Sequence, residues 1–374
     1  MATATRTRSI PFFNYKEAFS SNEPEYVEIF RDILRRGAFI QQQDLIDFER
    51  HLAEYLGVRH AIGVGNATDG LVFAWRAAGL APGDEVIFPS HTMVASPASV
   101  VHAGGVPVPV DCGPDHLIDP KVIEKAITKR TKAIMPVQLN GRTADMDAIQ
   151  AICDRHGLFI IEDSAQALGS KFKGRFAGTF GRAGVYSFYP AKILGCFGDG
   201  GAVVTNDDAI AERILLLRDH GRNHDGEVVT WGYNSRLDNL QAAILDRQFA
   251  NYGDIIAHRR GLAARYEEQL GELSQLQLAP APDSDPNHFD VYQNYEIQAD
   301  DRDALRAHLK EKGIGTLIQW GGKAVHQFKG LGLKVSLPMT ERLFERCLML
   351  PMNMMVSLDD VDYISECIRQ FYEA

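Results

Sequence analysis

The chain has 374 residues, 45% hydrophobic and 24% charged, a composition typical of a soluble globular enzyme. Its formal net charge of −10 excludes proteins that bind nucleic acid or a membrane surface through a general basic field. This length favours two or three domains with large cores.

The cysteines and the N-terminal residues bear on the compartment. The sequence shows neither metal-ligand spacing nor a disulfide framework among its five scattered cysteines, so we expect a reducing environment and no metal site. Residues 1–8 lack the apolar core of a signal peptide, and no apolar run reaches membrane-spanning length. These features predict a cytoplasmic protein without a membrane or nucleic-acid partner.

The first fifth of the chain predicts an arm followed by helices. Residues 1–20 form the arm, and apolar residues recur at helical spacing from Glu23 to Leu56. A short strand is predicted over 60–65. Thr68 or Asp69 is expected to cap the helix that follows this strand.

The next part alternates short apolar strands with helices, as a parallel sheet requires. Two of the strands are nearly continuous apolar runs, which is typical of strands covered on both faces. The predicted strands are 85–88, 107–110, 133–138, 158–162, 183–189 and 201–205, and the predicted helices are 92–103, 120–127 and 145–155. The fold class is therefore α/β, with a mostly parallel sheet of the seven-stranded type flanked by helices.

The C-terminal third predicts a smaller α+β domain. A helical pattern from Leu240 to about Leu270 leads into a loop rich in proline and aspartate, from Pro280 to His288. A strand over 292–297 and helices over 301–312, 340–348 and 359–372 complete this part. We expect an N-terminal arm (1–20), a large domain (21–255) and a small C-terminal domain (256–374).

One lysine stands where an aromatic, strand-like run meets a glycine-rich turn. Because a desolvated pocket lowers the pKa of an amine, Lys192 can form a Schiff base with an aldehyde cofactor or a carbonyl substrate. Upstream, an apolar strand ends in Asp163, whose carboxylate can keep a pyridine nitrogen protonated. Taken alone, the lysine also fits a solvated turn residue and the aspartate a loop cap.

Four further polar residues complete a candidate cofactor site. Thr68 and Asp69 offer a hydroxyl and helix-start N–H groups to an anion, although plain helix capping also explains them. Ser187 lies five residues before Lys192, so its hydroxyl can reach a phosphate while the amine reaches an aldehyde. Gln166 is a candidate partner of a ring hydroxyl, or a polar residue at a helix start. All lie near strand ends, where open α/β sheets bind ligands.

Nearly the whole chain resembles the DegT/DnrJ/EryC1/StrS family of sugar aminotransferases, which depend on pyridoxal 5′-phosphate (PLP) and have the aspartate aminotransferase fold of type I. The segments around Lys192 and Asn234 are specific to this family in combination. The markers of the resemblance are Ile10–Phe12, Gly37–Ile40, Phe48–Glu49, Asn66–Leu71, Pro89–Thr92, Ala144–Ala148, Glu162–Ala167, Ser187–Asp199 and Gly232–Ala243.

The resemblance implies where the cofactor is held. PLP is expected to be covalently bound to Lys192, which is catalytic together with Asp163, the partner of the pyridine nitrogen. Gln166 is the implied contact of the ring hydroxyl. The large domain is then the PLP-binding domain.

The resemblance also implies how the phosphate and the sugar are bound. Thr68, Asp69 and Ser187 match phosphate binders of the family. Asn234 matches an asparagine that reaches the phosphate in the neighbouring subunit, which implies a homodimer with shared active sites. The loop from Arg218 to His224 either serves a nucleotide-linked sugar or is a solvated charged loop.

Three departures from the family pattern concern the ring and the substrate. The position after Thr92 is usually an aromatic residue that stacks on the cofactor ring; here it is Met93, with His91 nearby. The family's Val-His-Leu-Tyr-Gly is here Val137–Gly141, with glutamine and asparagine in place of histidine and tyrosine. A His-Tyr-Pro…His stretch is replaced by Gln319–His326, one residue longer.

The expected reaction is transfer of the amino group of L-glutamate to a C3 or C4 keto group of a nucleotide-linked deoxysugar, for amino-sugar biosynthesis. Three alternatives remain. A keto-cyclitol substrate keeps the chemistry and changes only the acceptor. A PLP-dependent sugar dehydratase replaces the lysine with histidine, so Lys192 argues against it. A regulatory or binding protein on this scaffold predicts loss of Lys192, Asp163 or the phosphate cradle, and none is lost.

Overall fold

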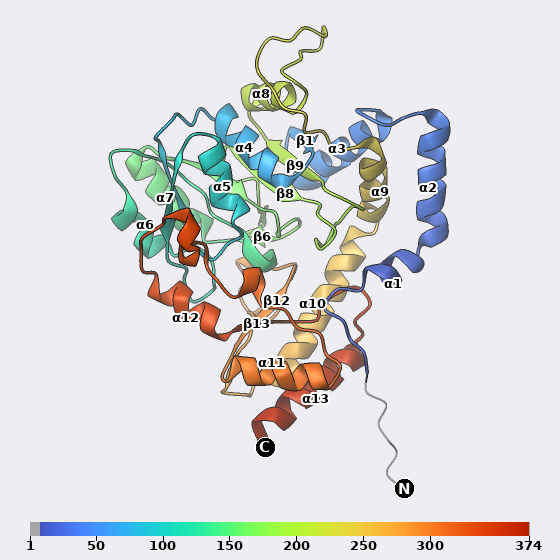
Figure 1. The fold of residues 1–374 in the computed structure, drawn as a ribbon, viewed down its shortest axis with the longest axis vertical. Helices are drawn as coiled ribbons and strands as arrows, with labels where there is room; N and C mark the ends of the chain where they lie inside the picture. The colour runs from blue at the N-terminus through green and yellow to red at the C-terminus, as the bar shows by residue number, and fades with distance from the viewer. Residues whose placement is uncertain (1–7, 374) are drawn as a thin grey trace.

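A seven-stranded sheet forms the centre of the large domain in the computed structural model, which describes residues 8–373 (Figure 1). Six of its strands run in one direction, and only β9 runs antiparallel to its two neighbours, β1 and β8. The spatial order is β1 (His60–Val64), β9 (Gly201–Thr205), β8 (Ala183–Ser187), β5 (Phe159–Asp163), β4 (Thr131–Ile134), β2 (Glu85–Pro89) and β3 (Val106–Val110). The predicted fold class is confirmed.

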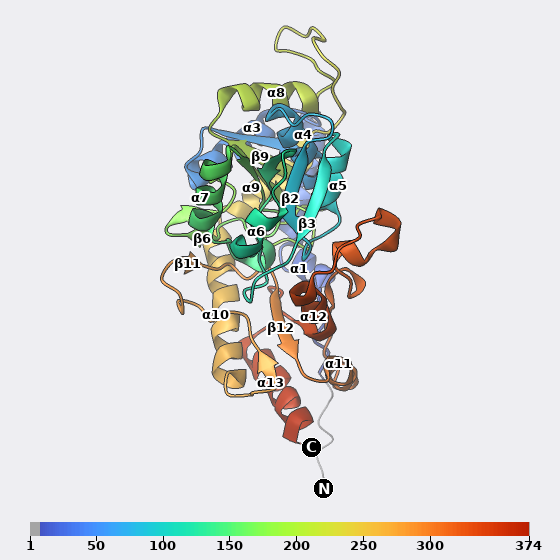
Figure 2. The same ribbon diagram turned by 90° about the vertical axis from the view of Figure 1, so that its left-hand side faces the viewer.

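Helices cover both faces of this sheet (Figures 1 and 2). Because side chains alternate along a strand, neighbouring residues enter different cores: Ile161 packs under one helix layer, whereas Ile160 packs under the other. The helices of the large domain are α2 (Glu23–Arg36), α3 (Gln43–Leu56), α4 (Ala67–Ala77), α5 (Ala95–His102), α6 (Pro120–Ala126), α7 (Met146–His156), α8 (Asp208–Arg218) and α9 (Asn239–Phe249).

The C-terminal part builds a second core around a three-stranded antiparallel sheet. Its strands are β10 (Leu276–Gln277), β12 (Tyr295–Ala299) and β13 (Cys347–Leu350). Its helices are α11 (Arg302–Glu311), α12 (Pro338–Arg346) and α13 (Leu358–Glu373), with short 3₁₀ turns η2 (Gln319–Gly321), η3 (Val325–Gln327) and η4 (Lys329–Leu331). Ile10 of the N-terminal segment is buried in this core and bridges Ile314.

The long helix α10 (Tyr252–Leu270) connects the two cores (Figure 1). Tyr252 and Ile256 lie in the core under the large sheet, while Tyr266 and Leu270 lie in the second core. The domain boundary expected at 255/256 therefore falls inside a helix that both cores share. The remaining elements are α1 (Tyr15–Ser20), η1 (Leu139–Gly141) and a small sheet of β6 (Lys171–Phe172), β7 (Arg175–Phe176) and β11 (His288–Phe289).

Three local predictions need correction. The cap of α4 is Asn66, whose side chain accepts a hydrogen bond from the Asp69 N–H, because Asn66 is the residue in extended conformation before the helix. The single helix expected over 240–270 is two helices, broken near Asn251. The strand expected over 133–138 has ladder pairing only in β4, and beyond it Val137 makes an isolated bridge to Asp163.

Residues 1–7 of the expected arm lie outside the described residues. The structure describes the arm from Arg8 onward. Among residues 8–373, every helix is too short or too polar to cross a membrane.

Candidate active site

The pairing of three strands places the candidate cofactor residues at one edge of the large sheet. Gly201 at the start of β9 is paired with Val64 on one side and with Ser187 on the other. Asp163 is the last residue of β5 and is paired with Val185 of β8. The end of β8, the end of β5 and the turn from β1 into α4 therefore meet at the same level.

Asp163 is buried at this edge of the sheet, with 5% of its surface exposed. Its Oδ2 accepts a 2.6 Å hydrogen bond from Ser96 Oγ, and its Oδ1 accepts a 3.1 Å bond from the Ala165 N–H. Burial raises the pKa of Asp163, and these two bonds and the charge of Lys192 oppose the rise. The neighbouring Glu162 faces the other side of the sheet, as strand alternation predicts. It accepts hydrogen bonds from the N–H groups of Gly178, Phe180 and Gly181.

Lys192 lies in the hairpin that joins β8 to β9. Burial lowers its pKa to about 8, and the opposite charge of Asp163 limits the decrease. The pairing of β8 with β5 brings the hairpin that carries Lys192 to the edge where Asp163 lies, and each of the two groups alters the pKa of the other. An amine with this pKa has a far larger unprotonated fraction near neutral pH than an ordinary lysine and is available as a nucleophile.

The turn before α4 forms a tight cradle beside Ser187. A Cβ added at Gly201 would lie 2.8 Å from the main chain of Asn66 and Ala67, so the turn packs directly on the sheet. The carboxylate of Asp69 accepts hydrogen bonds from Asn66 Nδ2 (3.0 Å) and Ser235 Oγ (2.7 Å). Asp69 therefore fixes the turn rather than presenting its own negative charge to an anion.

Gln166 follows β5 and faces polar partners from two other segments. Its Oε1 accepts the Asn140 N–H at 2.9 Å and Asn294 Nδ2 at 3.4 Å. The side chain is thereby fixed from its oxygen end. This arrangement leaves the amide nitrogen as the end that can meet a ligand.

The two candidates for ring stacking differ sharply in exposure. Met93 follows β2 with 52% of its surface exposed, whereas His91 is 1% exposed. The His91 ring packs edge-on against Trp320 and Phe344, and its Nδ1 lies 2.9 Å from the His116 carbonyl oxygen. The His91 ring is therefore already packed against protein side chains, and Met93 is the remaining candidate for stacking on the cofactor ring.

The model of the DegT/DnrJ/EryC1/StrS aminotransferase family matches residues 21–369. The chain belongs to this family. The identification from the Lys192 and Asn234 segments is thereby confirmed, and the chain is an aminotransferase.

Relatives of similar sequence cover nearly all of this aminotransferase. It is 39% identical to dTDP-3-amino-3,4,6-trideoxy-alpha-D-glucose transaminase of Streptomyces venezuelae, over 100% of this chain and 99% of the relative. It is 40% identical to a pleiotropic regulatory protein of Geobacillus stearothermophilus, over 97% and 99%. The crystal structure of S. venezuelae DesV in complex with a ketimine intermediate matches with a TM-score of 0.94 and 38% identity, over 98% of this chain and 100% of that one.

Asn234 of the aminotransferase is exposed and lies on the long segment between α8 and α9, which projects from the body of the molecule (Figure 1). Among residues 8–373, Asn234 bridges Asp219 and has no hydrogen bond to Lys192 or Asp163. Arg218, at the start of the loop suggested for a sugar ligand, is buried and donates to Glu49 and to the Gly63 carbonyl oxygen. Arg218 is therefore a structural residue, while Arg222 and His224 are exposed.

Sequence reasoning missed two residues that hold the candidate catalytic pair. Ser96 donates to Asp163 and exchanges a 2.7 Å bond with Thr92 Oγ1; the Thr-x-x-x-Ser spacing after β2 was the available signal. Gln293 holds both peptides that flank Lys192, since its Oε1 accepts the Ile193 N–H and its Nε2 donates to the Ala191 carbonyl oxygen, both at 2.8 Å. Nothing near Gln293 in sequence indicated this contact.

The residues present fit PLP. The buried Asp163 suits a pyridinium N–H, the Lys192 amine suits an aldehyde, and the N-terminus of α4 with Thr68 and Ser187 suits a phosphate. Within residues 8–373, no group of three or more His, Cys, Asp and Glu side chains is arranged to hold a metal ion.

Proposed function

We propose that this aminotransferase transfers an amino group from L-glutamate to a keto group of a nucleotide-linked sugar, with PLP covalently bound to Lys192. The observation that carries the proposal is the pairing of an amine of lowered pKa with a buried carboxylate at one sheet edge, Lys192 with Asp163. The dTDP-sugar transaminase among its relatives supports the sugar substrate.

Each group of site residues has a separate role in the proposed reaction. When bound, PLP supplies an aldehyde that exchanges with amines and a ring that withdraws electrons from the α-carbon of the bound amine. Asp163 would keep the ring nitrogen protonated, and Lys192 would move the proton from the α-carbon of the donor to the carbon that carried the aldehyde of the cofactor. Thr68, Ser187 and the N–H groups of the α4 turn hold the phosphate, with Asp69 and Asn66 fixing the turn.

We also propose a homodimer in which Asn234 reaches the phosphate of the neighbouring subunit. The projecting loop before Asn234 carries exposed apolar side chains, with Val228 66%, Val229 54% and Trp231 93% exposed. Exposed apolar side chains gathered on one loop support a contact with another protein chain. Met93 supplies the packing surface on the ring in each site.

The proposal is tested with the purified protein. We expect a yellow protein with a visible band that L-glutamate bleaches, and amination of one member of a panel of dTDP-, UDP- and GDP-linked 3- and 4-keto sugars, followed by mass spectrometry. A colourless protein that never takes up PLP contradicts the proposed cofactor. A yellow protein that aminates only a keto-cyclitol contradicts the proposed substrate.

The compartment and the remaining alternatives follow from the same residues. All five cysteines are free and buried, which supports the reducing cytoplasm as the site of action. The regulatory alternative predicts that Lys192, Asp163 or the phosphate cradle is lost, yet all three are present at one edge of the sheet. The dehydratase alternative requires histidine at position 192.

A further inference from the structure

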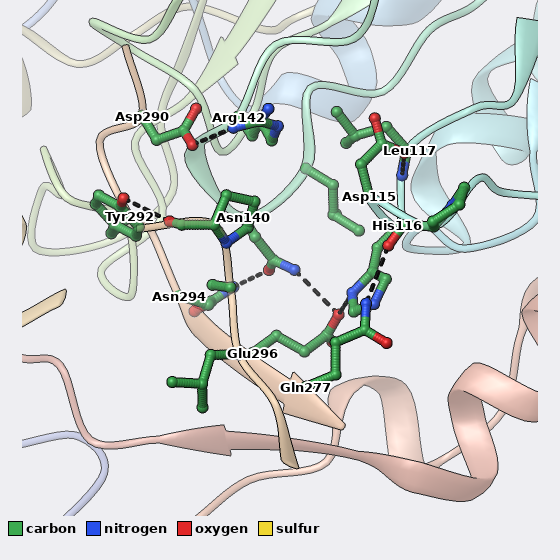
Figure 3. Close-up of a pocket in the computed structure, with 15 residues that line it drawn as sticks. Asp115, His116, Leu117, Asn140, Arg142, Gln277, Asp290, Tyr292, Asn294 and Glu296 are labelled. Carbon is green, nitrogen blue, oxygen red and sulfur yellow. Dashed lines mark hydrogen bonds and ion pairs between the residues drawn. The ribbon is translucent and has the colours of Figure 1, made fainter. Parts of the chain in front are cut away.

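A buried carboxylate gathers polar side chains where the small sheet meets the large domain. Glu296 on β12 is 3% exposed. Its Oε1 accepts His116 Nδ1 at 2.9 Å and Asn140 Nδ2 at 3.3 Å, and its Oε2 accepts Gln319 Nε2 at 3.0 Å and lies 3.6 Å from His91 Nε2. Figure 3 shows Glu296, Asn140 and His116 converging at the wall of a cavity of about 130 Å³.

Glu296 is ionised in this setting. Burial alone raises the pKa of a carboxyl group, but the charge and hydrogen bonds of His91 and His116 outweigh it and hold the pKa of Glu296 well below its usual range. A buried carboxylate accepts hydrogen bonds and donates none. It therefore fixes which end of each neighbouring amide turns toward it.

Glu296 fixes the orientation of the Asn140 side-chain amide, and this amide in turn contacts the next polar side chains. Because Asn140 Nδ2 donates to Glu296, its Oδ1 faces away and accepts Asn294 Nδ2 at 2.9 Å (Figure 3). The same Oδ1 accepts Gln319 Nε2 at 2.7 Å. Asn294 Nδ2 also lies 3.4 Å from Gln166 Oε1. The same Asn140 donates its main-chain N–H to Gln166 Oε1.

The orientation of the Gln166 amide follows from these donors. A main-chain N–H can only donate, so the end of Gln166 that faces Asn140 must be the oxygen. The Nε2 group, with two N–H donors, is then the end turned away from this network. A flipped Gln166 would place its NH₂ group against the donors of Asn140 and Asn294.

We propose that Asn140, Asn294 and Glu296 are positioning residues that hold Gln166 with its N–H donors toward the ring oxygen of the cofactor. The inference rests on the proposed PLP function. A hydrogen-bond donor that faces the ring oxygen stabilises the negative charge on that oxygen. The proton shared between the ring oxygen and the Lys192 nitrogen bound to the cofactor therefore dissociates at lower pH. The small domain thus sets a spectroscopic property of a cofactor held by the large domain.

The test is a pH titration of the visible band of the PLP-loaded protein. Gln166→Leu removes the donor and raises the midpoint by about half a unit to one unit, the net contribution of one hydrogen bond. Asn294→Ala and Glu296→Gln are expected to raise it in the same direction. In double variants with Gln166→Leu, neither change adds a further shift, because its effect acts through Gln166.

Glu85→Gln is the matched control. Glu85 is a buried glutamate at the opposite end of β2 from His91 and bonds to Arg130. The Glu85→Gln substitution is expected to leave the pH midpoint of the visible band unchanged. Asn294→Ala, at a less buried residue, serves if Glu296→Gln fails to fold.

The possible results separate this inference from the function on which it rests. Equal midpoints in the wild type and in both positioning variants, or shifts that add fully to that of Gln166→Leu, overturn the inference while the cofactor assignment stands. A wild-type protein without a visible band overturns the cofactor assignment and this inference with it.

Discussion

At the scale of single residues, chemistry depends on two side chains whose surroundings change their charge. The Lys192 amine is a nucleophile only when it is unprotonated, and burial lowers its pKa to about 8. The Asp163 pKa is raised by the same burial, which Ser96 and Lys192 oppose. The sequence indicated both residues, but their pKa values depend on packing that no local pattern encodes.

The lowered pKa predicts how capture of the cofactor depends on pH. Because only the free amine attacks the aldehyde, the rate of PLP binding to apoprotein should rise with pH and level off above a midpoint near 8. An unperturbed lysine would give a midpoint near about 10.4. Stopped-flow absorbance with added PLP measures this, and a midpoint above 10 contradicts the site geometry.

Asp163→Asn tests the partner of the ring nitrogen. Removal of one partner from a buried charge pair costs roughly 3–5 kcal/mol, so turnover should fall by about 10²–10⁴ while the protein still folds. Steady-state rates at saturating substrate, with bound PLP measured by absorbance, check this expectation. Near-normal turnover in a variant that retains PLP would remove the electron-withdrawing role from Asp163.

At the scale of elements, much of the large sheet was predictable and its local ends were not. The apolar runs of β5 and β9 and the helical spacing of α2 and α3 carry their own signal, because burial on fixed faces imposes a period. The contacts of Ser96 and Gln293 join residues 67 and 100 positions apart, respectively. Only the three-dimensional fold brings such pairs together. The Thr-x-x-x-Ser spacing could indicate Ser96 itself but not its contact with Asp163.

Gln293→Leu tests the support of the Lys192 hairpin. The variant loses two hydrogen bonds to the peptides beside Lys192, each with a net contribution of about 0.5–1.5 kcal/mol. We expect slower PLP capture and weaker retention during dialysis. Gln241→Leu is the control, because Gln241 binds the same hairpin at Phe197, away from the amine. Equal effects of the two variants would contradict a specific role for Gln293.

At the scale of the whole molecule, the proposed dimer concerns the exposed loop that carries Asn234. Asn234 lies on an exposed loop, and Trp231 nearby is almost fully exposed, which is costly for an isolated protein in water. The family resemblance suggested a shared site, and the position of this loop supports it. The dimer remains a prediction.

A mixing experiment tests the shared site directly. Lys192→Ala and Asn234→Ala proteins should each be nearly inactive. If Asn234 serves the neighbouring subunit, dissociated and reassembled mixtures contain heterodimers with one intact site and recover about a quarter of wild-type activity. If Asn234 serves its own subunit, every site in the mixture carries a defect. Light scattering confirms that dimers form in all samples.

The reversed direction of β9 has a consequence for the catalytic amine. Since β9 returns beside β8, the polypeptide between Ser187 and Gly201 turns back without crossing to the far end of the sheet. The amine is thereby carried by a short span tethered at both extremities to the rigid centre of the protein. We therefore expect the backbone that carries the nucleophile to stay fixed on the sheet, and segments outside this hairpin to supply any movement that admits a substrate.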